Sequence, residues 1–131
     1  MRKVYLDYAA TTPCDPEVLK AMEPFFFEKP GNASSIHSFG QDAKKGIEDS
    51  REALSDFIGA EAQEIVFTSG GTESDNMAIF GVVRNYRKGH IITSQFEHPA
   101  VLNACRELET EGYRVTYLRP SRAGFIKTSD V

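Results

Sequence analysis

The feature that most constrains this chain is an apolar strand that runs into a glycine turn and then into a helix, over residues 64–76. Gly70 and Gly71 form the turn, and Thr72 follows them in the first turn of the expected helix. The first turn of a helix presents unpaired backbone N–H groups and a partial positive charge. Because the two glycines let a ligand approach that backbone closely, the segment can hold a phosphate. The alternative is an ordinary strand–turn–helix join in which Ser69 or Thr72 caps the helix.

Composition restricts the kind of protein and its partners. The 131 residues are 40% hydrophobic and 26% charged, as in an ordinary globular domain. A net charge of −4 argues against nucleic-acid binding, and no apolar run is long enough to span a membrane. Cys14 and Cys105 are far apart in the sequence, which favours reduced thiols over a disulfide framework. We therefore expect a cytoplasmic protein without a nucleic-acid or membrane partner.

Helix signals dominate the first part of the chain. Asp15 is a typical N-cap residue and is followed by a proline, which predicts a helix over Pro16–Phe27. Apolar residues at steps of three, four and seven predict a second, longer helix that ends near Phe57, before Gly59. We expect residues 1–60 to form an N-terminal arm with its helices.

From residue 61 onward, short apolar strands alternate with helices. The expected strands are residues 65–68, 91–94 and 114–118. The helix that follows Gly71 is apolar on nearly every side, so we expect it to be buried. This alternation predicts an α/β fold with a parallel sheet covered by helices. Ligands of such sheets bind beyond the carboxyl ends of the strands, where both Thr72 and His98 fall.

Four motifs occur in a characteristic order along the chain. They are DYAATTP at residues 7–13, GNASSIH at 31–37, TSGGTESDN at 68–76 and EHPAV at 97–101. Their order and spacing resemble those of the cysteine desulfurases of the NifS/IscS branch, in class V of the pyridoxal-phosphate-dependent aminotransferases. The likeness covers only the amino-terminal third of the proteins in that family. It implies that residues 61–131 begin the cofactor-binding large domain of a fold-type I transferase, which is incomplete here.

The resemblance also implies a function. Members of this family use pyridoxal 5′-phosphate to remove sulfur from L-cysteine, which gives L-alanine and an enzyme persulfide. The sulfur then serves the assembly of iron–sulfur clusters and other thio-cofactors. The expected partners are L-cysteine, a second copy of the chain in a homodimer, and a sulfur acceptor or iron–sulfur scaffold protein.

Three cofactor contacts follow from the resemblance. Gly71 and Thr72 would bind the cofactor phosphate through backbone N–H groups and a hydroxyl. His98 would stack on the pyridine ring and move protons as the catalytic residue of this chain, because an imidazole is flat and titrates near neutrality. The alternative for His98 is a helix N-cap without a ligand.

Other positions have weaker or purely structural interpretations. By resemblance, Asn32 would lie near the substrate carboxylate and Ala10 and Thr11 would line the mouth of the active site, although turn formation also explains all three. The histidines show no metal-ligand spacing, so no metal is expected. Cys105 falls inside a predicted helix and is expected to be a packing residue.

The family's cofactor-binding lysine and its persulfide-forming cysteine have no counterpart in these 131 residues. We therefore expect the chain alone to be inactive, as a truncated gene product, a fragment or one piece of a split enzyme. Two other functions stay open: another class V enzyme, such as a selenocysteine lyase or an aminotransferase of small amino acids, and a non-catalytic protein that binds phosphate or dimerises.

Two sheet arrangements are compatible with the predicted strands. Periodicity alone places all three strands side by side in a compact Rossmann-like sheet. The family arrangement instead separates residues 65–68 from the other two strands and leaves open strand edges in this chain. We prefer the family arrangement.

Overall fold

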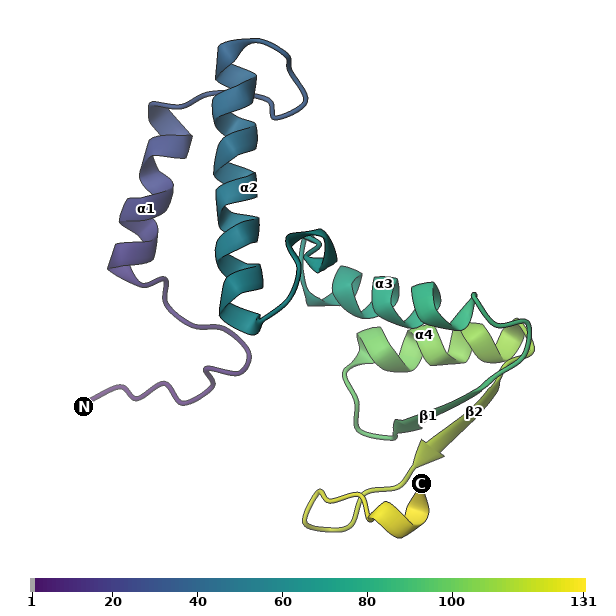
Figure 1. The fold of residues 1–131 in the computed structure, drawn as a ribbon. Helices are drawn as coiled ribbons and strands as arrows, with labels where there is room; N and C mark the ends of the chain where they lie inside the picture. Colours follow the sequence, from purple (N-terminus) through teal and green to yellow (C-terminus); the bar gives the residue numbers. More distant parts are fainter. Residues whose placement is uncertain (1) are drawn as a thin grey trace. The chain divides into compact units, whose positions relative to one another are not determined.

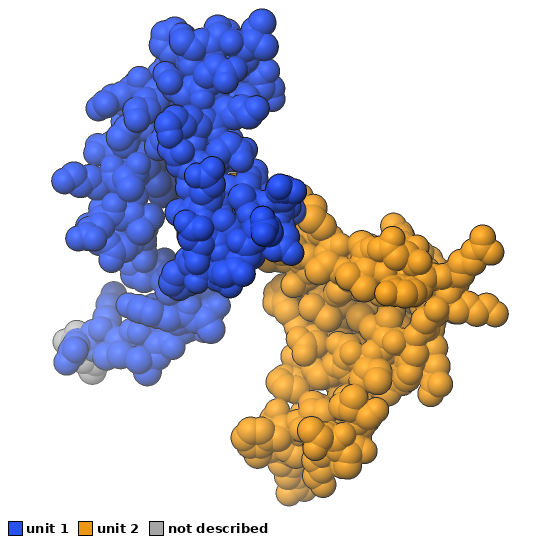
Figure 2. All heavy atoms as spheres, in the orientation of Figure 1, with its two compact units in different colours: residues 1–66 blue, residues 67–131 orange. Residues whose placement is uncertain are grey.

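A computed structural model describes residues 2–131 and divides the chain into two compact units, residues 1–66 and residues 67–131. Figure 2 shows the first unit in blue and the second in orange. The first unit is helical, whereas the second combines helices with a parallel sheet. Within residues 2–131, no helix has both the length and the apolar composition that a membrane span requires.

Helix α1 (Pro16–Phe27) begins where the sequence predicted. The Asp15 side chain accepts a hydrogen bond from the backbone N–H of Glu17 at 2.8 Å, which satisfies one of the unpaired donors of the first turn. Pro16 occupies the first helical position, where its missing N–H costs nothing. The predicted bounds and the predicted cap of this helix are confirmed.

Helix α2 (Ser38–Ile58) follows a loop and ends at a glycine. The His37 side chain caps it by accepting from the N–H of Gly40, at 3.3 Å. At the other end Gly59 adopts the left-handed conformation, with φ of 69°, which stops the helix as predicted. A short 3₁₀ helix, η1 (Ala62–Glu64), comes next.

The second unit has the alternating order helix, strand, helix, strand (Figure 1). Its elements are α3 (Gly71–Val83), β1 (His90–Ser94), α4 (Pro99–Thr110), β2 (Arg114–Leu118) and a terminal 3₁₀ helix, η2 (Thr128–Asp130). Strands β1 and β2 pair in parallel, in a register that runs from His90 opposite Arg114 to Ser94 opposite Leu118. Since α4 connects the two strands, this is the predicted βαβ arrangement, and the α/β fold class is confirmed.

The core of the second unit is one face of α4. Its buried apolar residues are Ala100, Ala104, Cys105 and Leu108. Ala100, Ala104 and Leu108 follow one another at steps of four, and Cys105 is three residues before Leu108, so all four lie on one face of the helix. Helix α4 packs against both β2 and α3. The prediction that Cys105 is a packing residue is confirmed, since only 1% of it is exposed.

The predicted strand at residues 65–68 was wrong. The sheet in the described residues has two strands, β1 and β2, and residues 65–68 are in neither. Ile65 has an extended backbone, but its carbonyl accepts a hydrogen bond from the Arg51 side chain. An extended segment becomes a strand only when a neighbouring strand takes up its backbone groups. The Rossmann-like sheet of three adjacent strands is therefore also wrong for this chain.

The expectation that α3 is buried was wrong as well. None of its residues is buried, and the exposed fractions of Met77 and Val82 are 48% and 61%. Helix α3 packs mainly on α4, which covers one side of it. A helix that is apolar on all sides tends to be covered by other elements. It is buried only where those elements are present in the structure.

Candidate functional site

The glycine turn leads directly into α3, as expected. Gly70 is the N-cap residue and provides no side chain to cap the helix, while Gly71 and Thr72 are the first two helical residues. A Cβ atom at Gly70 or Gly71 would meet no other atom within 4 Å, so the space beside this turn is open. The alternative in which Ser69 or Thr72 caps the helix was wrong.

Glu73 holds the residue that precedes the turn. Its Oε2 accepts hydrogen bonds from both the backbone N–H and the hydroxyl of Ser69, each at 2.6 Å. The hydroxyl bond and then the backbone bond lower the pKa of the Glu73 carboxyl from its ordinary value of 4.5. A carboxylate is also favoured electrostatically in the first turn of a helix. No sequence motif predicted this interaction.

Further hydrogen bonds link the two sides of the turn. The hydroxyl oxygens of Thr68 and Ser74 are 2.7 Å apart, and each hydroxyl also lies 3.3 Å from the Gly70 carbonyl oxygen. The Asn76 side chain donates to the Thr72 carbonyl at 2.7 Å. The side chains around the turn therefore bond mainly to one another, whereas the first N–H groups of α3 have no partner within the helix.

His98 is the N-cap residue of α4. Its Nδ1 accepts a hydrogen bond from the backbone N–H of Ala100 at 3.1 Å, and the residue is exposed. Because Nδ1 is the acceptor, the neutral ring carries its proton on Nε2. The structure thus gives His98 the capping role, one of its two predicted alternatives, and leaves the Nε2–H of the ring outside the cap bond.

Helices α3 and α4 pack against each other and begin at the same end of the pair (Figure 1). The glycine turn before α3 and His98 before α4 therefore lie at one end of the second unit. This is the juxtaposition that the sequence predicted from the alternation of strands and helices.

The other three predicted site residues belong to the first unit. Asn32 Oδ1 accepts from the N–H of Ser34 at 2.9 Å, so this side chain shapes its own loop. Ala10 and Thr11 lie in a turn in which both backbone N–H groups donate to the carbonyl of Asp7, at 3.1 and 3.4 Å. All three are exposed. Their roles toward a substrate stay predictions.

The loop that contains Asn32 is packed closely against the start of α2. A Cβ atom at the buried Gly40 would lie 2.3 Å from the carbonyl oxygen of Ser35 and 2.8 Å from that of Asn32. Only glycine fits at that contact. The sequence therefore fixes the backbone around Asn32, although this side chain is exposed.

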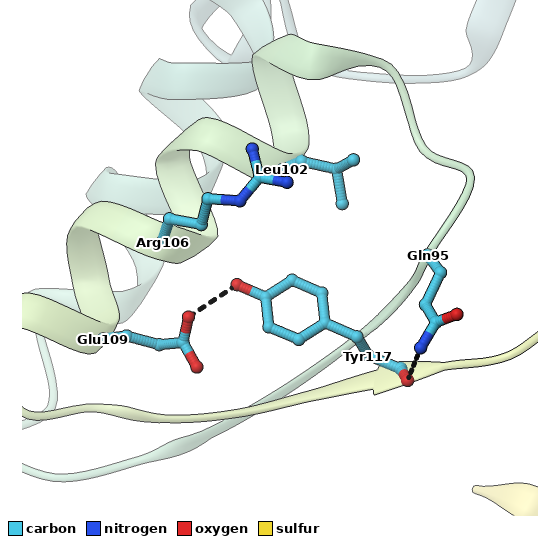
Figure 3. Close-up of a pocket in the computed structure, with 5 residues that line it drawn as sticks. All are labelled: Gln95, Leu102, Arg106, Glu109 and Tyr117. Atoms are coloured by element: carbon cyan, nitrogen blue, oxygen red, sulfur yellow. Dashed lines mark hydrogen bonds between the residues drawn. The ribbon is translucent and has the colours of Figure 1, made fainter.

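An open pocket of about 320 Å³ lies between α4 and β2 (Figure 3). It is lined by Gln95, Leu102, Arg106, Glu109 and Tyr117. The Tyr117 hydroxyl donates to Glu109 at 2.8 Å, and the Gln95 amide donates to the Tyr117 carbonyl at 3.4 Å. None of the predicted site residues lines this pocket.

The environment of Tyr117 disfavours its ionisation. Partial burial, followed by the hydrogen bond to Glu109 and the charge of that carboxylate, raises the pKa of the phenol from 10.0 to about 12. The sequence carried no signal for this pair, because the two residues are eight positions apart and lie on different elements.

Comparison with known proteins identifies the family. The aminotransferase class-V family model matches residues 4–131, so the chain belongs to that family. The cysteine desulfurase IscS of Dictyoglomus turgidum is 54% identical over 132 residues, which cover 99% of this chain and 34% of that protein. The putative cysteine desulfurase IscS 1 of Bacillus subtilis is 47% identical over 133 residues, and this match covers all of this chain and 35% of the relative.

A solved structure supports the same assignment. A structure of SspA in complex with cysteine matches 95% of this chain and 37% of its own, with 43% identity and a TM-score of 0.86. The predicted family is therefore confirmed. The chain spans about a third of the length of the curated relatives that it matches.

Proposed function

We propose that this chain is the first third of a cysteine desulfurase, which removes sulfur from L-cysteine and gives L-alanine and an enzyme persulfide. The observation that carries the proposal is the 54% identity to a cysteine desulfurase along nearly the whole chain. The structure with cysteine bound to a related protein supports this substrate. The activity requires the remaining two-thirds of the enzyme, because the chain spans only 34% of that relative.

The first turn of α3 fits the phosphate of pyridoxal 5′-phosphate. The space beside Gly70 and Gly71 is open, and the helix start provides N–H donors and a partial positive charge. Gly71 and Thr72 would hold the phosphate through their N–H groups, with the Thr72 hydroxyl as an additional donor. When bound, the cofactor supplies an electron sink for bond breaking in the amino-acid substrate.

His98 is the group of this chain that would stack on the cofactor and move protons. The cap bond to Ala100 holds Nδ1, so the proton of the neutral ring is at Nε2. While this bond is present, Nε2–H can donate a hydrogen bond. Nε2 can take up or return a proton only when Nδ1 is protonated and the bond from Ala100 is released, so proton transfer by His98 would require that the cap bond breaks. An imidazole is suited to this role because its proton affinity lies near neutral pH.

The remaining assignments rest on the family. Asn32 would lie near the carboxylate of L-cysteine, and Ala10 and Thr11 would line the active-site mouth. The enzyme would act as a cytoplasmic homodimer and transfer its sulfur to an acceptor or an iron–sulfur scaffold protein. Both cysteines of the chain are free thiols, in keeping with a reducing compartment.

A chimera tests the proposed function. This chain would replace the matching first third of the Dictyoglomus turgidum enzyme, and sulfide release from L-cysteine would be measured with pyridoxal phosphate and a reductant. We expect cofactor-dependent turnover by the chimera and none by the 131-residue chain alone. A folded chimera that binds the cofactor but releases no sulfide would contradict the proposal, as would turnover by the chain alone.

A further inference from the structure

The carboxylate of Glu73 holds the backbone just before the proposed phosphate turn through two hydrogen bonds. Both donors of Ser69, the backbone N–H and the hydroxyl, meet the same oxygen of Glu73 at 2.6 Å. Hydrogen bonds to a charged acceptor are roughly twice as strong as neutral ones. Glu73 is itself in the first turn of α3, so these bonds tie the incoming chain to the helix.

We propose that Glu73 is a positioning residue for the cofactor phosphate: by holding Ser69, it keeps the glycine turn in the conformation that presents the N–H groups of Gly71 and Thr72. This inference rests on the proposed function, and it adds a residue to that site. Glu73 does not touch the anion in this arrangement and acts through Ser69.

The occupied donors also define where the anion binds. Ser69 already donates both of its polar hydrogens to Glu73, and the hydroxyls of Thr68 and Ser74 bond within the turn. The N–H groups of Gly71 and Thr72 at the helix start are not used by these bonds. The negative charge of Glu73 further disfavours an anion on the Ser69 side of the turn.

Simple charge repulsion makes the opposite prediction. If the only effect of Glu73 on a bound phosphate were repulsion between like charges, removing the carboxylate would tighten binding. If Glu73 positions the turn, removing it weakens binding, because the mobile glycine backbone must then be ordered by the ligand itself. The sign of the change in affinity therefore separates the two effects.

The test compares three variants of the chimera. Glu73→Ala removes both hydrogen bonds, Glu73→Gln keeps an acceptor oxygen without the charge, and Glu17→Ala serves as a matched control. Glu17 is an exposed acidic residue in the first turn of another helix, α1. The readouts are the dissociation constant for pyridoxal phosphate, the midpoint of thermal unfolding, and hydrogen exchange of the Ser69 amide without cofactor.

We expect Glu73→Ala to weaken cofactor binding roughly fivefold or more and to speed exchange of the Ser69 amide, with the control unchanged. Glu73→Gln should restore most of the affinity. Unchanged or tighter binding by Glu73→Ala would overturn the inference, as would an unchanged Ser69 exchange rate. If the unmodified chimera binds no cofactor at all, the proposed function fails, while the exchange rate still reports whether Glu73 holds Ser69.

Discussion

Helices α3 and α4 lie side by side and begin at the same end, yet their first turns are completed differently. Helix α4 is capped by the His98 ring and begins with a proline, whereas α3 follows a glycine without any side-chain cap. The same unpaired N–H groups are thus satisfied by a side chain in one helix and left accessible in the other. Helix α4 thus completes its own first turn, while the first turn of α3 is suited to an external anion.

The two helices also differ in burial. Helix α4 contributes all of the buried apolar residues of the described chain, and α3 contributes none although it is the more apolar helix. Helix α4 has β2 on one side and α3 on another, whereas α3 packs mainly on α4. A helix that is apolar all round needs cover on several sides. In the full-length enzyme proposed above, the additional two-thirds of the protein would supply this cover.

The largest expected effect concerns His98, where capping and proton transfer can be separated. In the chimera, His98→Asn keeps a good capping acceptor but removes the imidazole ring. We expect turnover to fall by about 10²–10⁴-fold, the usual range for losing a positioned acid–base group. Binding of pyridoxal phosphate should change much less. The measurement is steady-state sulfide release beside a cofactor titration.

Two outcomes bound this prediction. His98→Gln, a poorer cap, should lose at least as much turnover as His98→Asn and should also unfold more easily. Normal turnover by His98→Asn would leave His98 as a helix cap only.

The difference in burial predicts the next effect. In the 131-residue chain, Leu108→Ala should lower the free energy of unfolding by about 2–5 kcal/mol, because this side chain is fully buried on α4. Val82→Ala on α3 should change it by less than about 0.5 kcal/mol, as for most exposed positions. Urea denaturation followed by circular dichroism measures both.

The same two substitutions can be compared in the chimera. If the rest of the enzyme covers α3, the cost of Val82→Ala should rise in the chimera, whereas that of Leu108→Ala should change little. An equally small cost of Val82→Ala in both proteins would show that α3 stays exposed.

The smallest effect is a pH dependence at Tyr117. Its folded-state pKa is raised from 10.0 to about 12, so the folded chain favours the neutral phenol. This contribution to stability is complete below pH 10 and is lost as the pH rises through about 12. Tyr117→Phe should remove one phenol from the absorbance titration of the folded chimera, with a midpoint near 12. If the titration step that disappears in Tyr117→Phe has its midpoint near 10 instead, the environment described for Tyr117 is contradicted.

Local signals predicted much of the fold. Asp15 and Pro16 marked the start of α1, and Gly59 marked the end of α2, because caps and stops depend on neighbouring residues. Residues 65–68 have the composition of a strand but lack a strand partner in the described structure. Pairing and burial depend on elements distant in sequence, so local patterns could not decide them.

The candidate site was predictable to a similar degree. The glycine turn and His98 were found from their positions at the ends of predicted strands. The bond between Ser69 and Glu73 was missed, because their spacing of four residues differs from that of the usual capping box. The role of Nδ1 of His98 as a helix cap was one of two alternatives, and the sequence could not choose between them.

Whether the first turn of α3 holds the cofactor phosphate is decided by comparing two ligands and two proteins. Dissociation constants for pyridoxal 5′-phosphate and for pyridoxal would be measured with the chimera and its Thr72→Ala variant. Loss of a hydrogen bond to the charged phosphate should weaken binding of pyridoxal phosphate roughly ten- to a hundredfold. Binding of pyridoxal should be unchanged, because it carries no phosphate. An equal loss of affinity for both ligands, or no loss for either, would contradict phosphate binding at the first turn of α3.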